Sequence, residues 1–559
     1  MPTESFPDTL YLPEHAALAL NCLTRCLNPT KHHLPYCLID LTGSPPRMQH
    51  TQFDYSDHTA RLIDALLLAQ ALSGERRGET ELERLEALFW PGFGTDGLHY
   101  TPDNPWSFRH ANMHYQRSVI SALLSLILAR GSERAAAQAR ALTKALVDIS
   151  IKRDGFWYFP SVERLPDGWP RGDWGILSFG VDPANTNGRL LFGLTRLHEL
   201  LGDENAGRLA AAYANHVMHH SSAYLPDGGF ATGMEFREGH FHSRALTMLG
   251  VIRYGHGFGD ARALAWGRQV FERAKSYGTT FGWFPERLVR ERAHGAETCA
   301  IVDMMEAAIW LARSGHDECW EDAERFLRNH VVESQLTSVD WAEACADERA
   351  ADEWQTTVDV AARALGGFAG WSQPNDLVSK VMHSWDLYMC CCAQGVRGLF
   401  NAWTNAVTAV PGRVQVNLLL NHADERAVVR SWLPHEGRLQ VTLRQAGNLA
   451  VRIPSWVDRR TLNATLAGQE LTWLAPSRHF IEFDRLPAGQ PIELTFPVAT
   501  RTSQERVLGD DYRMEWRGDT VMRMQPAGDR LPLYRRTGLA PGAVPTRPRP
   551  VPRIDFRLG

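Results

Sequence analysis

The segment Asp154-Gly155-Phe156-Trp157-Tyr158 decides the fold, because related segments recur along the chain. An Asp-Gly turn with aromatic residues after it also occurs at Asp96-Gly97-Leu98-His99-Tyr100 and Asp227-Gly228-Gly229-Phe230, and Phe281-Gly282-Trp283-Phe284 is a related form. A turn that recurs in this way is typical of a repeat architecture. The pattern indicates that one structural unit is repeated several times in succession.

Pairs of helical segments lie between and around these turns. Residues 57–72 carry apolar side chains at helical spacing and end at Ser73-Gly74, which predicts a helix. Six such pairs are expected, over 57–73 with 79–90, 110–131 with 133–150, 185–202 with 204–219, 240–257 with 260–276, 296–314 with 317–333, and 351–366 with 386–408. Most pairs contain a short loop, whereas long loops join successive pairs. We therefore expect a mainly α fold, an (α/α)6 barrel whose long loops line one funnel.

The pattern of the chain changes after about residue 410. Segments such as 413–420, 438–443, 449–453 and 492–496 alternate apolar with polar residues, and turn residues lie between them. This alternation predicts an antiparallel β-sandwich domain after the barrel. The expected organisation is an N-terminal cap over 1–50, the barrel over 51–408, the sandwich over 409–536 and a Pro-rich surface arm over 537–559.

Composition excludes several classes of partner. Of the 559 residues 44% are apolar and 22% are charged, and the formal net charge is −5, so nothing favours binding to nucleic acid or to an anionic membrane. The chain shows neither a signal peptide nor an apolar run long enough to span a bilayer. We expect a cytoplasmic protein, with a homodimer as an open alternative for its assembly.

The cysteines are the strongest chemical signal. Cys390-Cys391-Cys392 are consecutive at the start of the last helix, and Ala296-Glu297-Thr298-Cys299 opens the fifth helical pair. The barrel brings both segments to the same funnel, where thiolates and a carboxylate suit zinc. The alternative is that these cysteines are small buried core residues, as cysteines often are. The residues by themselves leave both interpretations open.

These motifs carry a resemblance to a known family. Glu297-Thr298-Cys299, followed far along the chain by Cys391-Cys392 and Arg397, resembles glycoside hydrolase family 127, the β-L-arabinofuranosidase-like proteins. Val451-Arg452-Ile453-Pro454-Ser455-Trp456 is similar to a segment of that family's β-sandwich. This chain has Ala393-Gln394-Gly395 where the family commonly has two prolines and an asparagine. That departure puts the identity of the sugar in doubt.

The resemblance implies a retaining glycosidase with a cysteine nucleophile. It implies Zn²⁺ held by Glu297, Cys299, Cys391 and Cys392, with Cys391 as the attacking thiolate. It implies a glutamate acid/base in the loop over 281–292, for which we choose Glu286, with Glu291 as the alternative. Cys390 is left without a role and is expected to be a buried small residue.

Several side chains are candidates for binding the sugar. His240 and His242 belong to a segment that looks like the family's Gly-His-x-x-Arg-Ala motif, and either one suits the prediction. His114 lies before the second helical pair, and Trp283 is an aromatic residue in the acid/base loop. All four are expected at the funnel.

Three functions are therefore weighed. The leading one is a zinc-dependent exo-glycosidase that cleaves furanosides, such as β-L-arabinofuranosides, from a small oligosaccharide or glycoside. The second is an (α/α)6 lyase or sugar epimerase that uses His and Tyr for acid-base chemistry, which leaves the cysteines unexplained. The third is a carbohydrate-binding relative without catalysis.

Overall fold

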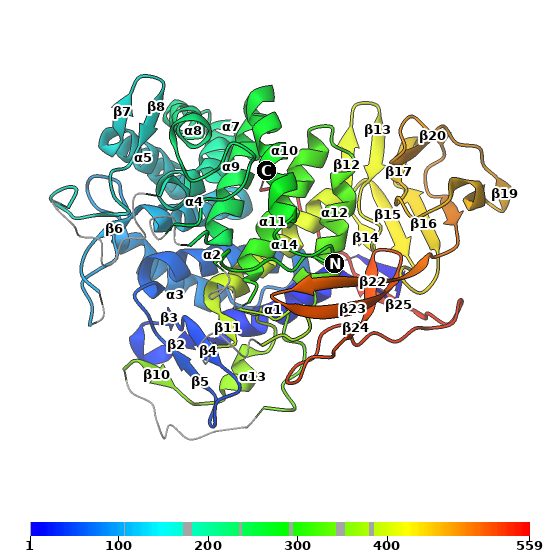
Figure 1. The fold of residues 1–559 in the computed structure, drawn as a ribbon, viewed down its shortest axis with the longest axis horizontal. Coiled ribbons are helices and arrows are strands. Elements are labelled where there is room, and N and C mark those ends of the chain that lie inside the picture. The colour runs from blue at the N-terminus through cyan, green and yellow to red at the C-terminus, as the bar shows by residue number, and fades with distance from the viewer. Residues whose placement is uncertain are drawn as a thin grey trace.

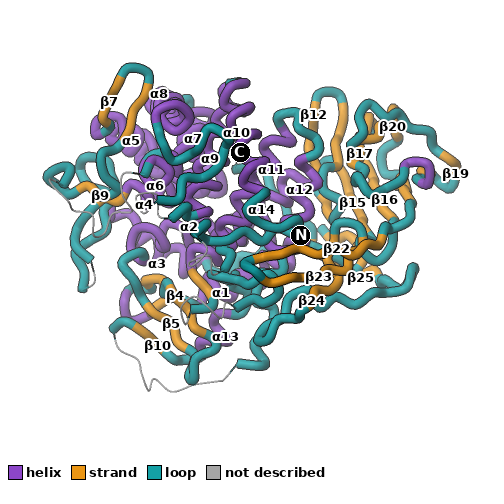
Figure 2. The backbone as a smooth tube through the Cα atoms, viewed as in Figure 1, coloured by secondary structure: helices purple, strands orange, loops and turns teal. Residues whose placement is uncertain are grey.

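The computed structural model of the chain describes residues 2–105, 107–170, 182–233, 238–289, 295–342, 353–378 and 385–558, with Asn185 described by its backbone only. A large helical body and a lobe of β-strands lie side by side (Figures 1 and 2). The helical body is an (α/α)6 barrel, and the strands come almost entirely from the part of the chain after it.

Six helices form the inner wall of the barrel, and each contacts the next around a closed ring. They are α2 (Thr59–Ser73), α4 (Met113–Arg130), α7 (Leu191–Leu201), α9 (Phe241–Phe258), α11 (Thr298–Arg313) and α14 (Met389–Ala406). Most of these helices are buried on nearly all sides, and every residue of α14 is buried. A helix buried all round belongs to the centre of a domain, which matches their place in the ring.

An outer layer of six helices covers this ring within the described residues. It consists of α1 (Leu12–Arg25), α3 (Glu79–Phe89), α5 (Glu133–Ile149), α8 (Glu204–Asn215), α10 (Ala261–Lys275) and α12 (Cys319–Phe326). These helices bury one face only, as amphipathic surface helices do. Two short helices, α6 (Pro183–Thr186) and α13 (Val360–Ala364), lie in the loops.

The N-terminal segment differs from the expected cap. Helix α1 packs against both α2 and α14, so it is the outer helix that closes the ring. The helix expected over 351–366 is reduced, in its described part, to α13. The physical reason is that α14 needs an outer partner to bury its apolar surface, and the N-terminus supplies it.

The repeated turns connect the outer helices to the inner ones. Gly97, Gly155, Gly228 and Gly282 all have positive φ, between 78° and 99°. A Cβ atom at Gly97 would lie 2.7 Å from the carbonyl oxygen of Ala141 on α5. Glycine is therefore required at this turn both by its backbone conformation and by its close approach to an outer helix.

Short strands also occur in the segments that connect the barrel helices. One four-stranded sheet joins β10 (Gln355–Thr356), β5 (Arg47–Gln49), β4 (Leu38–Asp40) and β11 (Leu387–Tyr388) in that order. The other small pairs are β2 (Leu27–Asn28) with β3 (Leu34–Pro35), β6 (Ala111–Asn112) with β9 (Glu163–Arg164), and β7 (Ile151–Arg153) with β8 (Phe156–Tyr158). Strand β11 leads directly into α14 and so fixes where that helix begins.

Two sheets form the β-sandwich, and they enclose a hydrophobic core separate from that of the barrel. One sheet has the order β12 (Val407–Val410), β13 (Arg413–Val416), β17 (Gly447–Arg452), β20 (Phe480–Leu486). The other has the order β14 (His422–Ala423), β15 (Ala427–Ser431), β16 (Arg438–Leu443), β21 (Pro491–Thr495), β18 (Asn463–Leu466), β19 (Gln469–Glu470). All pairs are antiparallel except β13 with β17, which run parallel.

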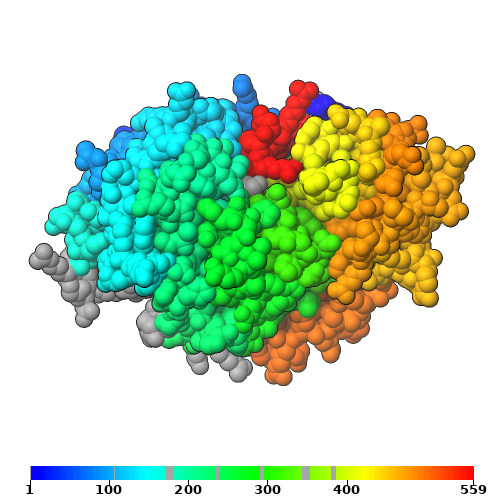
Figure 3. All heavy atoms as spheres, turned by 90° about the horizontal axis from the view of Figure 1, so that it is seen from above, coloured from blue at the N-terminus to red at the C-terminus, as the bar shows by residue number. Residues whose placement is uncertain are grey.

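The end of the chain returns to the barrel. Strands β22 (Thr500–Val507), β23 (Asp510–Arg517) and β24 (Thr520–Gln525) form a separate sheet whose apolar side chains join the barrel core. The Pro-rich segment contains β25 (Thr546–Pro550), which pairs with β1 (Thr3–Pro7). Figure 3 shows the last residues lying between the helical body and the sandwich.

Arg452 connects the sandwich to the barrel. Its guanidinium pairs with Glu324 of α12, and its Nε donates to the carbonyl of Asn417 at 2.6 Å. Trp456 follows in the same segment, and its indole donates to Asp519 at 3.0 Å. The segment 451–456 is thus a junction between the two domains. Among the helices that the structure describes, none has the length and apolarity that crossing a membrane requires.

Candidate functional site

The candidate site lies where the inner helices of the barrel begin. Arg61 is near the start of α2, His114 near that of α4, and Arg189 in the 3₁₀ turn Gly188–Leu190 that leads into α7. His240, Glu297 and Cys390 stand at the starts of α9, α11 and α14. Helix N-termini carry partial positive charge, which favours anionic groups such as thiolates and carboxylates.

Three cysteine sulfurs meet at this end of the barrel. The Sγ atom of Cys299 lies 3.8 Å from that of Cys390 and 3.6 Å from that of Cys391. The sulfurs of Cys390 and Cys391 are 3.8 Å apart. All three residues are buried, and together they form a group that could hold a metal ion.

The three thiols differ in the direction in which the site shifts their pKa. Burial raises the pKa of both Cys390 and Cys391 well above the usual thiol value. Burial opposes ionisation of Cys299 as well, but hydrogen bonds with Cys390 and Cys391, helped by Arg61 and Arg117, lower the pKa of Cys299. Cys299 is therefore the most readily ionised of the three thiols.

A cavity of about 440 Å³ opens beside this cluster. Its polar and charged lining consists of Thr51, Gln52, Asp57, Arg61, His114, Arg189, His240, His242, Glu286, Arg287, Glu297 and Cys390. Its volume lies in the range of small-molecule sites, about 300–1,000 Å³. Cys390 is the one sulfur of the three that lines this cavity and is 8% exposed, whereas Cys391 is fully buried behind it.

Two carboxylates share the cavity with Cys390. His240 Nε2 lies 3.6 Å from Glu297 Oε2 and 4.0 Å from Glu286 Oε1. The Glu286 main chain is fixed on both sides, since its N–H donates to Gly295 and its carbonyl accepts from Phe241, each at 2.7 Å. Both side chains are about 5% exposed, so proton exchange at either one takes place in a nearly dry site.

Two further histidines are held by buried partners. His242 Nδ1 lies 2.6 Å from Asp303 Oδ2, and burial raises the pKa of Asp303. His114 Nε2 contacts the guanidinium of Arg189, which also bonds Ser243. Ser243 Oγ is in turn 2.6 Å from His240 Nδ1. His114 and His240 are therefore linked through Arg189 and Ser243, and His242 is held separately by Asp303.

Several solved structures resemble this chain in fold. A GH127 β-L-arabinofuranosidase from Geobacillus stearothermophilus T6 aligns with a TM-score of 0.57 and 14% identity over 92% of this chain and 80% of its own. Another GH127 β-arabinofuranosidase aligns with a TM-score of 0.60 and 13% identity over 91% of this chain and 81% of its own. This chain has the GH127 fold. A third structure, described as a glycoside hydrolase, aligns with a TM-score of 0.57 and 14% identity, covering 89% of this chain and 85% of its own.

The resemblance to GH127 seen in the sequence thus agrees with the fold. At these identities the likeness is one of fold, and the chemistry must be argued from the residues themselves. No family model and no curated protein matches the chain.

The structure contradicts the prediction that Cys392 is a zinc ligand beside Cys299. Cys392 Sγ lies 3.3 Å from the main-chain nitrogen of Phe368 and 3.9 Å from Cys22 Sγ on α1, away from Cys299. Cys390 takes its place beside Cys299 and Cys391. Successive helix residues point about 100° apart, so three consecutive cysteines cannot all face one site.

Trp283, which was expected to bind the sugar, does not line the cavity. Trp283 is 1% exposed, and its indole donates to the carbonyl of Ser372, so it belongs to the barrel core and does not line the cavity. Aromatic side chains of Trp371, Trp385 and Tyr388 line the cavity instead. Glu291, the alternative acid/base, lies outside the described residues.

Sequence reasoning missed the arginines of the site. Arg61 and Arg189 line the cavity and are 5% and 1% exposed. The signal that could have found Arg61 is that it is one of two charged residues, with Asp64, in the mainly apolar helical run over 59–72. Arg189 lies in a segment that we expected to be regular helix, where nothing set it apart.

The sulfur cluster fits a zinc ion. Sulfurs bound at about 2.3 Å at the corners of a tetrahedron lie about 3.8 Å apart. The three separations here are 3.6, 3.8 and 3.8 Å. Glu297, two residues before Cys299 and on the same cavity, is a candidate for the fourth donor, and its charge acts on the thiol of Cys391. Three thiolates with one carboxylate form a donor set that suits zinc.

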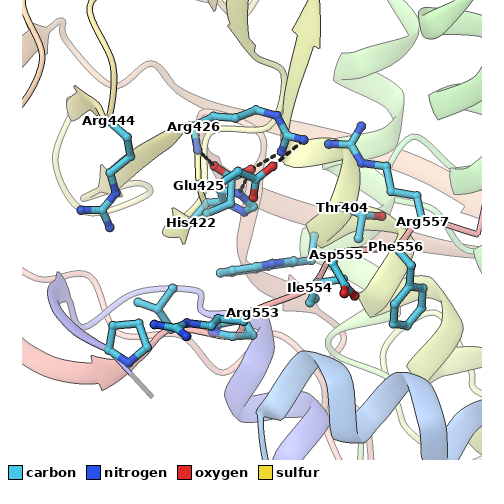
Figure 4. Close-up of a pocket in the computed structure, with 15 residues that line it drawn as sticks. Thr404, His422, Glu425, Arg426, Arg444, Arg553, Ile554, Asp555, Phe556 and Arg557 are labelled. Atoms are coloured by element: carbon cyan, nitrogen blue, oxygen red, sulfur yellow. Dashed lines mark hydrogen bonds and ion pairs between the residues drawn. The ribbon is translucent and has the colours of Figure 1, made fainter. Parts of the chain in front are cut away.

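A larger cavity lies elsewhere and contains none of these groups. It has a volume of about 810 Å³ and is lined by residues 551–557 together with parts of α14 and the sandwich (Figure 4). Its most prominent cation, Arg426, is paired with Asp424 and Glu425. Because no cysteine is among its described lining residues, we place the chemistry at the smaller cavity.

Proposed function

We propose that the protein is a retaining exo-glycoside hydrolase that cleaves furanosides, with Cys390 as nucleophile and Glu286 as acid/base. The observation that carries the proposal is that three sulfurs at zinc-compatible distances present one of their number, Cys390, to a cavity that also contains Glu286 and Glu297. The cavity volume of about 440 Å³ suits a terminal sugar of a small glycoside.

In the first step the Cys390 thiolate attacks the anomeric carbon. The carbon–sulfur bond forms as the bond to the leaving oxygen breaks, and Glu286 gives its proton to that oxygen. The electron pair of the broken bond remains on the leaving alcohol, and the sugar is held as a thioglycoside. Glu286 suits this role because its carboxyl is nearly dry and its main chain is fixed.

In the second step the Glu286 carboxylate removes a proton from water. The water oxygen attacks the anomeric carbon, the carbon–sulfur bond breaks, and the thiolate of Cys390 is restored. Two displacements at one carbon return the sugar with its original anomeric configuration. His240 lies within 4.0 Å of both carboxylates and is placed to hold a sugar hydroxyl between them.

Cys299, Cys390, Cys391 and Glu297 would hold the zinc ion. Zinc bound there would keep the thiol of Cys390 ionised at neutral pH, where burial otherwise raises its pKa. The resemblance to family 127 implies Cys391 as nucleophile, but Cys391 is fully buried and does not line the cavity, so we assign that role to Cys390. Cys391 is assigned to holding the metal alone.

The alternative of a lyase or epimerase finds histidines in the cavity but no activated tyrosine among its described lining residues. Tyr388 lines the cavity, but burial raises the pKa of Tyr388 far above its usual value, whereas a catalytic tyrosine base requires a lowered one. That alternative also gives no role to the sulfur cluster. A binding protein without catalysis is separated from the proposal by the experiment below.

The test combines metal analysis with cysteine variants. Purified protein is expected to contain about one zinc per chain, and Cys299→Ser or Cys391→Ser is expected to lose most of it. Cys390→Ser is expected to abolish hydrolysis of nitrophenyl furanosides, a loss of roughly 10³-fold or more.

The matched control is Cys392→Ser, one residue further along the same helix. It is expected to keep zinc and to stay within about twofold of wild-type activity, because Cys392 faces α1. Zinc-free protein with full activity, or full activity in Cys390→Ser, contradicts the proposal. A zinc-containing protein that binds sugars and hydrolyses none favours the binding alternative.

A further inference from the structure

Arg189 is hydrogen-bonded to two side chains of the site at once. Its Nη1 atom donates to Nε2 of His114 on α4, and its Nη2 atom donates to Oγ of Ser243 on α9. Arg189 is 1% exposed, and nearby carboxylates, Glu297 among them, act on its charge. A guanidinium has five N–H groups and no acceptor, so the direction of both hydrogen bonds is fixed.

The bond to His114 determines where the proton of that ring lies. Because Arg189 can only donate, Nε2 of His114 accepts and carries no proton. A neutral imidazole has one protonated nitrogen, which in His114 is then Nδ1. His114 lines the cavity and is 8% exposed, so this assignment concerns a residue of the site itself.

Ser243 extends the effect of Arg189 to a second histidine. Its Oγ atom lies 2.6 Å from Nδ1 of His240, and the same oxygen accepts from Arg189. A hydroxyl group that accepts a hydrogen bond from a cation becomes a stronger donor, because hydrogen bonds in a chain polarise one another. The hydroxyl proton of Ser243 is therefore expected to point at Nδ1 of His240.

The opposite side of the His240 ring favours the same arrangement. Nε2 lies 3.6 Å from Oε2 of Glu297 and 4.0 Å from Oε1 of Glu286. An unprotonated Nε2 would direct its lone pair at these oxygens, whereas an N–H group is attracted to them. A doubly protonated ring would add a second positive charge close to Arg189. Both sides of the ring thus favour a single proton on Nε2.

We propose that Arg189 and Ser243 are positioning residues for the histidines of the site. They hold His240 with its proton on Nε2, toward the two glutamates, and His114 with its proton on Nδ1. The inference rests on the proposed function for its role in the reaction. A sugar hydroxyl that accepts from the N–H of His240 can donate its own proton to a carboxylate oxygen. The same N–H stabilises the carboxylate that Glu286 becomes when it gives its proton to the leaving oxygen.

Nitrogen NMR of protein labelled with ¹⁵N-histidine tests the proton positions without any substrate. The signals of the two rings are assigned by their absence in His240→Ala and in His114→Ala. At neutral pH we expect a protonated Nε2 and an unprotonated Nδ1 in His240, and the reverse in His114. Ser243→Ala is expected to abolish the preference in His240 alone, and Arg189→Met in both rings. Ser243→Thr keeps a hydroxyl group and is expected to retain it.

Kinetics tests whether Ser243 acts through His240. Ser243→Ala is expected to lower kcat/KM for nitrophenyl furanosides roughly tenfold, as the loss of one hydrogen bond allows, while the zinc content stays unchanged. In a His240→Ala background the same change is expected to have no further effect, because the residue through which it acts is gone.

Ser125→Ala is the matched control. Ser125 is also a fully buried serine on an inner helix, α4, and its hydroxyl is bonded to Asp64. Its loss is expected to leave the signals of both histidine rings and kcat/KM unchanged.

Several outcomes overturn the proposal. One is a wild-type His240 ring that carries its proton on Nδ1 or on both nitrogens. Another is a Ser243→Ala or Arg189→Met protein whose histidine signals match those of the wild type. A third is an effect of Ser243→Ala on kcat/KM that adds in full to that of His240→Ala. If these variants do not fold, the wild-type spectrum decides alone.

Failure of this inference is distinguishable from failure of the proposed function. The NMR measurement does not depend on turnover, so the expected proton positions in a protein without hydrolysis keep the positioning roles and remove the reaction. Hydrolysis by a protein with the His240 proton on Nδ1 removes only the positioning roles.

Discussion

Single side chains determine the chemistry of this site through their direction on the helix. Cys390 and Cys391 are neighbours in sequence, yet one lines the cavity and the other is buried behind it. Two histidines at the start of α9 also differ: His240, the residue before the helix, faces the glutamates, and His242, in its first turn, is bonded to Asp303. Successive helix residues point about 100° apart, so neighbours in sequence can have different roles.

Glu286→Gln tests the acid/base assignment. Loss of the proton donor is expected to lower turnover of alkyl glycosides by roughly 10²–10⁴-fold, the usual contribution of general acid–base catalysis. Nitrophenyl glycosides need little protonation of the leaving oxygen, so their first step is expected to survive. Rapid-mixing measurements should then show a burst of nitrophenol followed by slow turnover.

The control for this prediction is Glu238→Gln. Glu238 also lies near Arg287, at 3.8 Å, but does not line the cavity. It is expected to keep the same ratio of activity on the two leaving groups as the wild type. Equal losses on alkyl and nitrophenyl substrates in Glu286→Gln would show that Glu286 is not the proton donor.

At the level of elements, the repeated turns position the funnel. Each turn connects an outer helix to the start of an inner one. A change in the conformation of a turn is therefore expected to displace the residues at the start of that inner helix. Gly97 combines φ of +91° with a close approach to Ala141, whereas Gly131, at a helix C-terminus, has φ of +61° and open space around it. Comparing alanine substitutions at the two glycines therefore separates the free-energy cost of the backbone conformation from that of close packing.

Gly97→Ala and Gly131→Ala provide a matched test of this point. Gly131→Ala is expected to reduce the free energy of unfolding by about 1 kcal/mol, the penalty for a left-handed alanine. Gly97→Ala is expected to cost at least about 2 kcal/mol, because the new methyl group also meets a carbonyl oxygen. Denaturant unfolding monitored by circular dichroism measures both values, and equal losses would refute the packing explanation.

At the scale of the whole molecule, the last segment of the chain ties the lobes together. Tyr534 is buried and its hydroxyl lies 2.9 Å from His330 Nδ1 on the barrel side. His330 Nε2 lies 2.8 Å from Ser372 Oγ, so both ring nitrogens are engaged. Burial lowers the pKa of His330 to about 3, which means that the folded protein holds this ring neutral.

The sign of the pH effect follows from that depressed pKa. The unfolded chain takes up a proton on His330 below its ordinary pKa of about 6.5, while the folded chain does not until about pH 3. Its contribution to stability is thus complete above pH 6.5 and is lost as the pH falls. By pH 4 the loss is expected to be on the order of 3 kcal/mol.

Thermal melting between pH 7 and pH 4 checks this expectation. His330→Gln removes the titrating ring, so its melting temperature is expected to fall less steeply with decreasing pH than that of the wild type. His219→Asn, which changes an exposed histidine, is expected to follow the wild-type slope. Identical slopes for wild type and His330→Gln would show that His330 does not contribute to the acid sensitivity.

Local patterns in the sequence predict five of the six helix pairs, the long loops between the pairs and the change to strands near residue 410. These follow from local periodicity and turn residues, which depend on neighbours along the chain. The sequence also singled out Cys299, Glu286, Glu297, His114, His240 and His242, all of which the fold brings to one end of the barrel. Only the tertiary structure decided that α1 closes the ring and that Cys390, and not Cys392, joins Cys299. Those choices depend on how each helix is rotated and which distant surface it buries, and packing between segments far apart in the chain fixes both.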